Sequence, residues 1–501
     1  MRFDRARLAL PAAAVCGVLA TLGFGPFGGW PLALVGYAGL FALAEHQGWR
    51  RAALIGWIFG FAHFGTGVYW VYISTHVYGG APAWLGALLA AALFLYLGVY
   101  PALVAAIAAR LRWLSGGAGW IATPALGLIV EMARGYSYGK FPWMDYGYVL
   151  LDTPARRLAP LLGVYGLTAL ALLLSYALFR LARGSRPEKL AAAVVLFAPL
   201  LTVLLPAPSA WTRSAGAPLT AALVQSDIKQ DEKWKPYMRI EALYRHQVMT
   251  QEAWPADLVI WPEVALTQPY EALADDYLPA IDADAKAHGG GVLIGILIGH
   301  EGEFSNSLLA LGAAQGRYDK VHLAPFGEYF PVPDFLLPLM QVLNLPFSDF
   351  VFGAENQAPI TLGPHRIAAG ICFDDAFASD TARGARDAEV LVNVTNDAWF
   401  AGSSAPAQHL QFSRMRAAET GRWMLRAANT GISALITPDG EIAAQLPQFQ
   451  QRVLKGNFEP RTGATPYMRW RDRPLWALCA LALGYLGWRR HASLPARGDM
   501  Q

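Results

Sequence analysis

The sequence predicts a protein of two parts, a bundle of membrane-spanning α-helices and an α/β domain that faces water. Hydrophobic residues make up 54% of its 501 residues and charged residues only 15%, whereas soluble chains are usually about 25% charged. Apolar stretches of about 20 residues, the length that crosses a bilayer, recur through residues 1–206. After residue 207 the pattern changes to short apolar runs between helical stretches, which is typical of an α/β domain.

Eight apolar stretches are candidates for membrane spans. They lie near residues 8–23, 31–46, 52–74, 83–109, 119–134, 160–180, 190–206 and 475–488. The first follows three arginines and so resembles a signal peptide, but further spans follow at once, which favours an uncleaved first helix. We therefore expect seven spans before the α/β segment and one after it, about eight in all.

Positive charge gathers on alternate connectors between these stretches. The charged connectors and chain ends carry Arg2, Arg5, Arg7, Arg50, Arg51, Arg110, Arg112, Arg180, Arg183, Arg186, Lys189, Arg489 and Arg490. Connectors 24–30 and 74–82 contain no lysine or arginine. Because positive charge marks the cytoplasmic side, both chain ends are expected in the cytoplasm. The segment 207–474 is then expected on the outer side of the cytoplasmic membrane.

One connector disagrees with this orientation. Residues 135–159 hold Lys140, Arg156 and Arg157 on the side that is predicted to face outward. This connector is longer than the others and also carries two aspartates. The other connectors therefore decide the predicted orientation.

The segment after residue 207 contains short apolar runs with the composition of buried strands. These runs cover residues 219–224, 257–261, 291–298, 366–372 and 390–394, with further strand-like runs at 304–311, 432–437 and 451–457, and helical stretches at 236–253, 270–288 and 406–428. The chain is expected to divide into a transmembrane domain (1–206), a linker (207–217), an α/β domain (218–460), a second linker (461–474), a last transmembrane helix (475–488) and a tail (489–501).

An apolar arm, residues 330–352, interrupts the α/β segment. It contains too many prolines for a membrane span and is too apolar for a loop in water. One interpretation is a loop folded onto the core of the domain. The other is an arm or lid that touches lipid, because the domain is tethered beside a membrane.

Three polar residues, Glu263, Lys320 and Cys372, stand at or just beyond the ends of predicted strands, where α/β sheets usually place their sites. Cys372 is the single cysteine outside the apolar stretches, since Cys16 and Cys479 lie within them. A carboxylate can accept the thiol proton, and a lysine cation can stabilise a thiolate and an oxyanion. Taken singly, each residue has a plainer interpretation, as a helix cap, a solvated charge and a core residue.

The flanks of these three residues carry a family resemblance. Trp-Pro-Glu at 261–263, Lys-Val-His-Leu-Ala-Pro-Phe-Gly-Glu at 320–328, Gly-Ile-Cys-Phe-Asp at 370–374 and Asn-Asp-Ala-Trp-Phe at 396–400 resemble, in order and spacing, the nitrilase (carbon–nitrogen hydrolase) superfamily with its Glu-Lys-Cys triad. Together with the eight predicted spans, they resemble the apolipoprotein N-acyltransferase family of the bacterial inner membrane. The resemblance extends into the membrane part, for example at 65–74.

This resemblance implies a nitrilase-like αββα sandwich, placed in the periplasm, and a reaction. An acyl chain would pass from a membrane phospholipid, with phosphatidylethanolamine as the expected donor, to the N-terminal α-amino group of diacylglyceryl-cysteine in an apolipoprotein. Cys372 would carry the acyl chain as a thioester, with Glu263 as general base and Lys320 stabilising the charged intermediate. Two half-reactions imply ping-pong kinetics. The resemblance implies no metal or cofactor, and we expect a monomer.

The resemblance also assigns supporting residues and contains one departure. Glu328 would be a supporting carboxylate, and Trp234 matches a tryptophan at the site entrance, although it could equally be a stray surface aromatic. The family commonly has Cys-Tyr-Glu where this chain has Cys372-Phe373-Asp374, so the roles of those two side chains stay open. The main-chain N–H of Phe373 could still serve an oxyanion hole, because that donor needs no particular side chain.

Two other functions remain compatible with parts of the sequence. A membrane-anchored amidase would use the same three residues on a small amide, but one anchor would suffice for it, and the many spans and the apolar arm favour a lipid substrate. A non-enzymatic lipoprotein-binding protein is disfavoured because Glu263, Lys320 and Cys372 occur together. A net charge of +3 is too small to indicate nucleic-acid binding. In an acyltransferase, arm 330–352 is the candidate for keeping water from the thioester.

Overall fold

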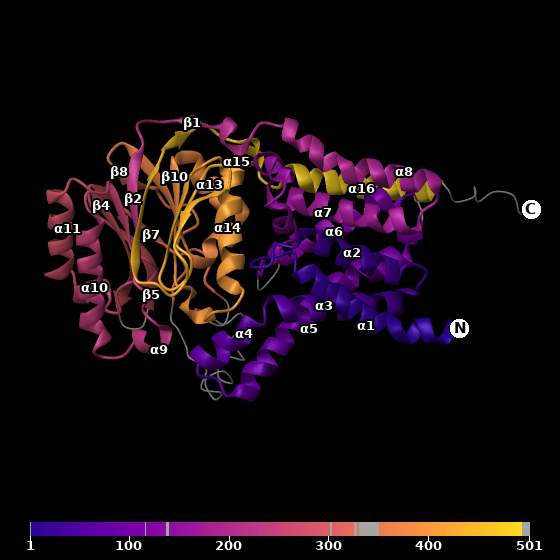
Figure 1. The fold of residues 1–501 in the computed structure, drawn as a ribbon, viewed down its shortest axis with the longest axis horizontal. Coiled ribbons are helices and arrows are strands. Elements are labelled where there is room, and N and C mark those ends of the chain that lie inside the picture. The colour runs from indigo at the N-terminus through magenta and orange to yellow at the C-terminus, as the bar shows by residue number, and fades with distance from the viewer. Residues whose placement is uncertain are drawn as a thin grey trace, which may run out of the picture.

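A computed structural model describes most of the chain and shows a helical part joined to an α/β part (Figure 1). The described residues are 2–115, 117–136, 140–300, 303–324, 328–329 and 350–492. The predicted apolar arm therefore lies outside the described residues except for its last three, of which Phe350 forms a β-bridge with Phe304.

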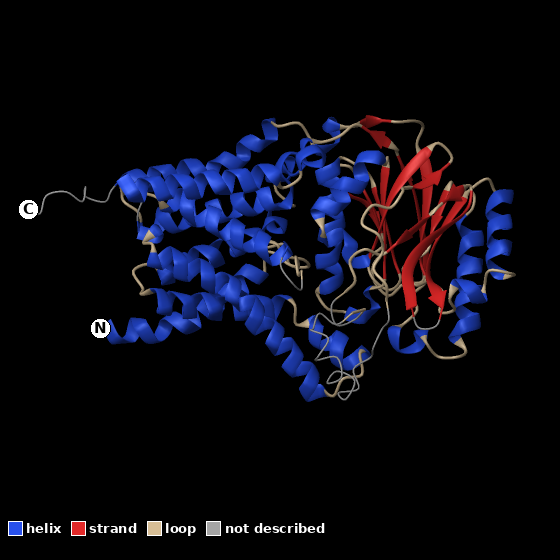
Figure 2. Cartoon of the chain, turned by 180° about the vertical axis from the view of Figure 1, so that it is seen from behind, coloured by secondary structure: helices blue, strands red, loops and turns tan. Residues whose placement is uncertain are grey.

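Two β-sheets stack face to face in the α/β part (Figure 2). Among the described residues, one sheet has the strand order β14-β2-β3-β4-β5-β7 and the other has the order β13-β12-β11-β10-β9-β8-β6. The central strands β2, β3 and β4 are parallel, as are β9, β10 and β11, whereas the flanking strands pair antiparallel. The strands are β1 (Arg213–Ser214), β2 (Leu219–Gln225), β3 (Leu258–Ile260), β4 (Gly291–His300), β5 (Glu303–Gly312), β6 (Ala314–Gln315), β7 (Arg317–Asp319), β8 (Ile360–Leu362), β9 (His365–Ile371), β10 (Val390–Thr395), β11 (Met424–Ala428), β12 (Ala434–Ile436), β13 (Ile442–Gln445), β14 (Arg452–Phe458) and β15 (Arg461–Thr462).

The two sheets and the helices outside them form a four-layer αββα sandwich, as the sequence predicted. Side chains that alternate along each strand pack either between the sheets or against the outer helices. Ala221 and Leu223 of β2 belong to the core between the two sheets. Ala222 and Val224 face the other way and pack in the cluster that α10 (Met238–Ala253) and α11 (Tyr277–Ala287) share, because successive side chains of a strand point to opposite faces. Helices α13 (Ala378–Gly384) and α14 (Ala405–Thr420) lie against the other sheet.

Two of the predicted helices have different bounds in the structure. The stretch 406–428 was expected to be one helix, but α14 ends at Thr420 and residues 424–428 form β11. Gly421 follows the helix in the left-handed conformation, with φ 61°, where glycine is the favoured residue. All five residues of β11 are buried between β10 and β12, so tertiary pairing overrides their helical composition. The stretch 270–288 also contains a shorter helix than expected, because α11 starts at Tyr277.

The helical part contains helices at all eight predicted stretches. They are α1 (Arg2–Thr21), α2 (Trp30–Ala44), α3 (Trp49–Gly67) with α4 (Trp70–Tyr72), α5 (Ala83–Arg110), α6 (Gly119–Tyr136), α7 (Ala159–Arg183), α8 (Arg186–Phe197) with the 3₁₀-helix η5 (Ala198–Leu204), and α16 (Arg473–Ala492). Within the described residues, three helices are long and apolar enough to cross a membrane, those at 83–110, 154–183 and 186–204. A fourth qualifies if the bent pair 49–67 and 70–78 is one span.

The bend in that pair departs from the predicted continuous span 52–74. The chain turns by 54° after α3 and continues through α4 into a π-helix, η1 (Ile73–Tyr78). Gln408 of α14 donates its side-chain N–H to the Gly67 carbonyl (3.0 Å) and accepts the indole N–H groups of Trp70 (3.3 Å) and Trp143 (2.7 Å). A side chain that takes a helix carbonyl is a recognised cause of kinks, so α14 helps to set this bend.

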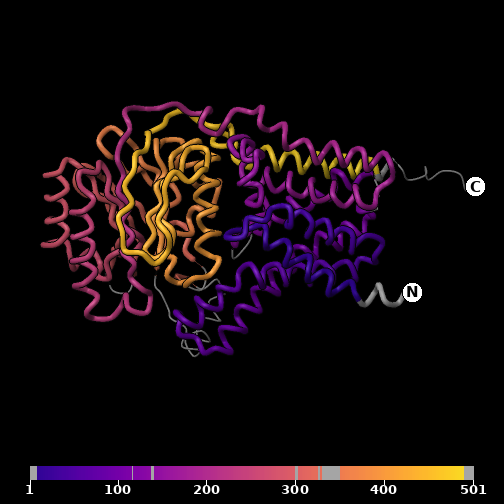
Figure 3. The backbone as a smooth tube through the Cα atoms, viewed as in Figure 1, coloured from indigo at the N-terminus to yellow at the C-terminus, as the bar shows by residue number. Residues whose placement is uncertain are grey.

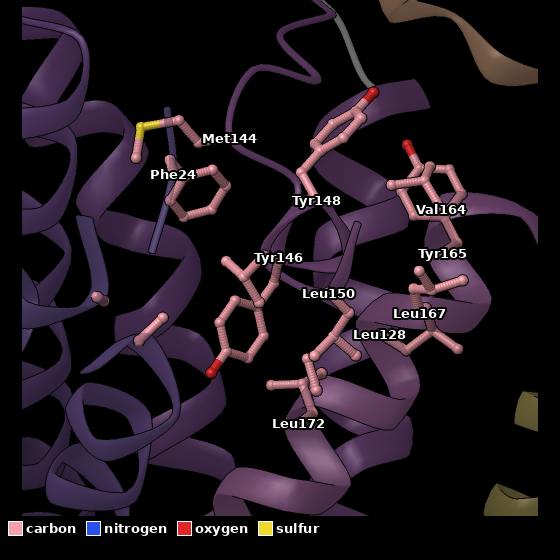
Figure 4. Packing of buried hydrophobic residues seen from close by; sticks show 14 of the residues in the cluster. Phe24, Leu128, Met144, Tyr146, Tyr148, Leu150, Val164, Tyr165, Leu167 and Leu172 are labelled. Carbon is pink, nitrogen blue, oxygen red and sulfur yellow. The ribbon is translucent and has the colours of Figure 1, made fainter. Parts of the chain in front are cut away.

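Helix α14 joins the two parts of the molecule. Its residues Leu410 and Phe412 belong to the same apolar cluster as Tyr146 and Tyr148 of the helical part. In Figure 4, Tyr146, Tyr148 and Leu150 lie between Phe24 on one side and residues of α6 and α7 on the other. The apolar core of the helices thus continues into the outer layer of the sandwich, which fixes the α/β part against the helical bundle.

Candidate active site

Glu263, Lys320 and Cys372 each follow a strand, and the structure brings them together. Glu263 comes after β3, Lys320 after β7, and Cys372 opens the 3₁₀-turn η9 (Cys372–Ala376) that follows β9. Lys320 is 1% exposed and Glu263 5% exposed, so their charges lie almost entirely out of water. Each side chain projects from a fixed strand end, which holds the three groups in one place.

Lys320 lies between two carboxylates. Its ammonium nitrogen is 2.9 Å from Oε1 of Glu263 and 2.9 Å from Oε1 of Glu328. The side-chain amide of Asn306 on β5 donates to the same two oxygens, at 2.8 and 3.0 Å. The main-chain N–H of Ala324 donates to the other Glu328 oxygen at 2.8 Å. One cation and one amide therefore fix both carboxylates, and Glu328 contacts Lys320 directly.

The second oxygen of Glu263 is held from the other sheet. It accepts the main-chain N–H of Asn396 at 2.8 Å, in the loop after β10. The Asn396 side chain is itself fixed, because its amide donates to Gln230 (3.1 Å) and its oxygen accepts from Asn429 (2.8 Å). Both oxygens of Glu263 are thus oriented by groups from different elements.

The charges of this cluster determine which group carries a proton. Burial opposes ionisation of Glu263, but the Lys320 cation lowers the pKa of this carboxyl below its usual value. Burial also opposes the charge of Lys320, yet Glu263 and Glu328 raise the pKa of its ammonium well above the usual range. Burial raises the pKa of the Cys372 thiol, Glu263 raises it further, and Lys320 acts against both. At rest the site therefore holds a carboxylate, an ammonium and a protonated thiol. Cys372 is not a thiolate in this state, so a base must remove its proton before the sulfur can attack.

The main chain of Cys372 has an unusual conformation. Its φ is 50°, in the left-handed region that non-glycine residues seldom occupy and that is often found at functional sites. Its carbonyl oxygen accepts hydrogen bonds from the side chains of Asn393 (3.2 Å) and His409 (3.1 Å). These contacts hold the turn that presents the thiol.

The side chains of Phe373 and Asp374, the two residues that depart from the family pattern, make their contacts outside the cluster of Glu263, Lys320 and Glu328. The ring of Phe373 stacks on Trp143 of the helical part, with centroids 6.1 Å apart. Asp374 accepts the main-chain N–H groups of Ile371 (2.9 Å) and His322 (2.7 Å) and the hydroxyl of Tyr318 (3.0 Å). Asp374 therefore anchors the turn at Cys372, while Phe373 packs against the membrane part.

Trp234 lies at the end of the short helix α9 (Gln230–Lys233) and is 53% exposed. Its neighbour Lys233 is buried, with its ammonium 3.5 Å from the main-chain oxygen of Glu263. Burial lowers the pKa of Lys233 to about 8. The structure thus places Lys233, which the sequence did not single out, against Glu263, whereas the predicted Trp234 is exposed.

The sequence analysis did not identify several other residues of the site. Asn306 lies among the polar residues in the first half of β5, and nothing in that pattern distinguishes it from its neighbours. A second buried network contacts the Cys372 main chain and consists of His409, Asp397, Asp375, Arg426 and Ser413. Among the residues that the structure describes, no three His, Cys, Asp or Glu side chains are grouped so as to bind a metal ion.

The stacked sheets, with Glu263, Lys320 and Cys372 at their strand ends, define a carbon–nitrogen hydrolase domain, and residues 220–467 match the family described as "Carbon-nitrogen hydrolase". Residues 16–177 match "Apolipoprotein N-acyltransferase N-terminal domain". The apolipoprotein N-acyltransferase of Methylococcus capsulatus is 38% identical over 97% of both chains. That of Azotobacter vinelandii is 40% identical over 97% of this chain and 96% of its own. The chain belongs to the apolipoprotein N-acyltransferase family, and it is an acyltransferase.

A solved structure is also similar to part of this chain. This carbon–nitrogen hydrolase superfamily protein of Xanthomonas campestris has 19% sequence identity and a TM-score of 0.38, and covers 53% of this chain and 97% of its own.

The buried network predicts a pH dependence of stability. Burial and Arg426 oppose protonation of His409, but Asp397 and Asp375 raise its pKa from 6.5 to about 9. Because the folded state binds this proton more tightly, its contribution is complete below about pH 6.5 and is lost as pH rises through about 9. The loss is on the order of 3 kcal/mol, since one pKa unit corresponds to about 1.4 kcal/mol. Chemical unfolding at several pH values measures it.

The comparison variant is His409→Gln, in which this titration is absent. Lys233, with its lowered pKa, titrates in the same range with the opposite sign, so the difference between wild type and variant isolates His409. Parallel pH dependences in the two proteins would show that folding does not raise the pKa of His409.

Proposed function

We propose that this chain transfers an acyl chain from a membrane phospholipid to the α-amino group of the diacylglyceryl-cysteine at the N-terminus of an apolipoprotein, through a thioester on Cys372. The observation that carries the proposal is the 2.9 Å contact of Lys320 with Glu263, the two groups whose charges act on the Cys372 thiol. The names of the relatives supply the substrate class. Phosphatidylethanolamine is the expected donor, and the chain is expected to act as a monomer.

In the first half-reaction, Glu263 accepts the thiol proton as the Cys372 sulfur attacks the ester carbonyl carbon of the phospholipid. The negative charge that develops on the carbonyl oxygen is stabilised by the Lys320 ammonium. When the intermediate collapses, the carbon–oxygen bond to the glycerol breaks, and the Glu263 carboxyl returns its proton to that oxygen. The products are a lysophospholipid and a thioester on Cys372.

In the second half-reaction, the neutral α-amino group of the apolipoprotein attacks the thioester carbon. Glu263 accepts a proton from the nitrogen, and the carbon–sulfur bond breaks as the amide forms. The thiolate is then protonated by Glu263, which restores the resting state. Glu328 and Asn306 hold the side chains of Lys320 and Glu263 in position during both half-reactions.

The membrane part gives this reaction a physical reason to occur at the bilayer. Both substrates carry acyl chains in the membrane, and moving a chain into water costs about 0.8 kcal/mol per CH₂ group. The stacking of Phe373 on Trp143 joins the residue after the nucleophile directly to the helical part. A site fixed against the helices in this way can take acyl chains without extracting them.

We further propose a multi-pass protein of the bacterial inner membrane with about eight spans, both termini in the cytoplasm and the α/β domain in the periplasm. Helices α1 and α16 both run toward the end of the bundle farthest from the α/β part (Figure 3), which supports this orientation. At the same end, Glu45 contacts Arg180 (3.3 Å) and Arg183 (3.4 Å) of the last turn of α7.

The connectors support the same orientation. The connector that contains Gly25 lacks positive charge and contacts Gln411 of α14, with a Gly25 N–H to Gln411 distance of 2.9 Å. Connector 135–159 is the one whose positive charges disagree with this orientation. In it, Arg156 pairs with Glu441 of the α/β part (2.6 Å), and Arg157 donates to two carbonyl groups near the end of η5. Those arginines therefore have specific partners on that side, which accounts for their exception to the charge rule.

The matched family ranges support the division proposed from composition. The first range, 16–177, falls within the transmembrane domain 1–206. The second, 220–467, begins within the proposed α/β domain 218–460 and extends slightly into the linker 461–474.

Incubation of the purified protein with phosphatidylethanolamine is expected to give an acyl adduct on Cys372 that hydroxylamine removes, because a thioester is the intermediate. Mass spectrometry of the Cys372 peptide measures it. Cys479→Ser should form the adduct as the wild type does, and Cys372→Ser should form no thioester. A hydroxylamine-sensitive adduct that persists in Cys372→Ser would place the nucleophile elsewhere and refute the proposed mechanism.

A membrane-impermeant maleimide tests the proposed orientation. Added to intact spheroplasts, it is expected to modify Cys372 in preference to Cys16 and Cys479, since the α/β domain is proposed to face outward. Peptide mass spectrometry reads each cysteine separately. Labelling of Cys372 only after the membrane is opened with detergent would reverse the orientation.

A further inference from the structure

A network of buried charged side chains contacts the main chain of Cys372. His409 of α14 lies at its centre, with Asp397 of the 3₁₀-turn η11 (Asp397–Phe400) at 2.8 Å and Asp375 of η9 at 3.2 Å. Arg426 of β11 contacts Asp397 at 3.1 Å. All four residues are at most 2% exposed. The proposed acyl-transfer mechanism uses none of them.

The surroundings of His409 require a doubly protonated ring. Its Nδ1 faces the Asp397 carboxylate, and its Nε2 faces both the Cys372 carbonyl oxygen and the Asp375 carboxylate. Carboxylate and carbonyl oxygens accept hydrogen bonds and do not donate them. Both ring nitrogens therefore donate, and His409 is an imidazolium whose charge Asp397 and Asp375 balance, with Arg426 alongside.

The same network orients a second donor to the Cys372 carbonyl. Arg426 donates to Oδ1 of Asn393 at 2.9 Å, which leaves the Asn393 amide N–H to donate to the Cys372 oxygen at 3.2 Å. The carbonyl of the nucleophile thus accepts one hydrogen bond from a cation and one from an amide that a second cation has oriented.

Fixing this carbonyl also fixes the next N–H group. In a trans peptide the C=O of one residue and the N–H of the next point in opposite directions, so the Phe373 N–H points away from α14. We propose that His409 is a positioning residue for acyl transfer: by hydrogen bonding to the Cys372 carbonyl, it aims and polarises the Phe373 N–H as a donor to the oxyanion. This inference rests on the proposed acylation of Cys372.

The positive charge of His409 has an effect beyond orientation. A cation that hydrogen-bonds to an amide oxygen draws electron density from the nitrogen through the peptide resonance. The N–H on the far side then becomes a stronger donor, as in other cooperative hydrogen-bond chains. A neutral donor in place of His409 would keep part of the orientation and lose this polarisation.

Two reactions of the same thiol separate this role from a structural one. Acylation of Cys372 by phosphatidylethanolamine passes through an oxyanion, whereas alkylation by iodoacetamide displaces iodide and forms none. The experiment measures both rates at Cys372 by peptide mass spectrometry, in the full-length protein in detergent. It compares wild type, His409→Gln, His409→Leu and the control His365→Gln. His365 pairs with Glu389 at the opposite end of β9.

In His409→Leu the acylation rate is expected to fall about 10- to 100-fold, somewhat less than the ~10²–10³-fold loss on removing an oxyanion donor outright. His409→Gln, which keeps a neutral N–H, is expected to lie between this variant and the wild type. Alkylation should stay near the wild-type rate in both, and His365→Gln should match the wild type in both reactions.

The inference would be overturned if His409→Gln and His409→Leu both had the same ratio of acylation rate to alkylation rate as the wild type. This holds whether the two rates are unchanged or fall by the same factor. If His409→Leu does not fold, the ratio in His409→Gln alone decides. If wild type forms no adduct with phospholipid, the proposed function fails. The same variants are then compared with p-nitrophenyl acetate, an activated ester that also forms an oxyanion, and the same ratio decides the inference.

Discussion

The contact on which this site depends is the one between the buried ammonium of Lys320 and the carboxylates of Glu263 and Glu328. A lone charge at this depth would cost several kcal/mol, and removing one member of a buried pair typically costs about 3–5 kcal/mol. Two carboxylates and one ammonium leave one negative charge, and the buried ammonium of Lys233 next to Glu263 offsets it. The cluster can therefore be ionised out of water while the adjacent thiol remains protonated.

Helix α14 gives the site its connection to the membrane part. Gln408 binds the bend after α3, and the next residue, His409, binds the Cys372 carbonyl. Phe373, which follows the nucleophile, stacks on Trp143, whose indole also donates to Gln408. One buried helix thus contacts both the bend in the helical part and the turn that presents the nucleophile. The loss of a tyrosine hydroxyl at Phe373 is consistent with its apolar surroundings.

Sequence patterns predicted the features that arise from local composition. The strand runs, the order of the two parts and the grouping of Glu263, Lys320 and Cys372 were all visible, because strand ends converge in a sheet. What the patterns missed depends on distant partners. The end of α14 and the start of β11 follow from pairing with neighbouring strands, and the bend after α3 follows from Gln408. His409 sits on a polar-looking helix that is in fact buried all round, which composition alone could not reveal.

The most direct test of the account is acyl transfer itself, measured with phosphatidylethanolamine carrying a labelled acyl chain and a synthetic diacylated lipopeptide as acceptor. The account predicts that the wild-type protein places the label on the lipopeptide α-amino group as a stable amide and that Cys372→Ala places none there. Transfer by Cys372→Ala at the wild-type rate would contradict the thioester route. Release of the label by the wild type as free fatty acid alone, with the amine unmodified, would instead indicate a hydrolase.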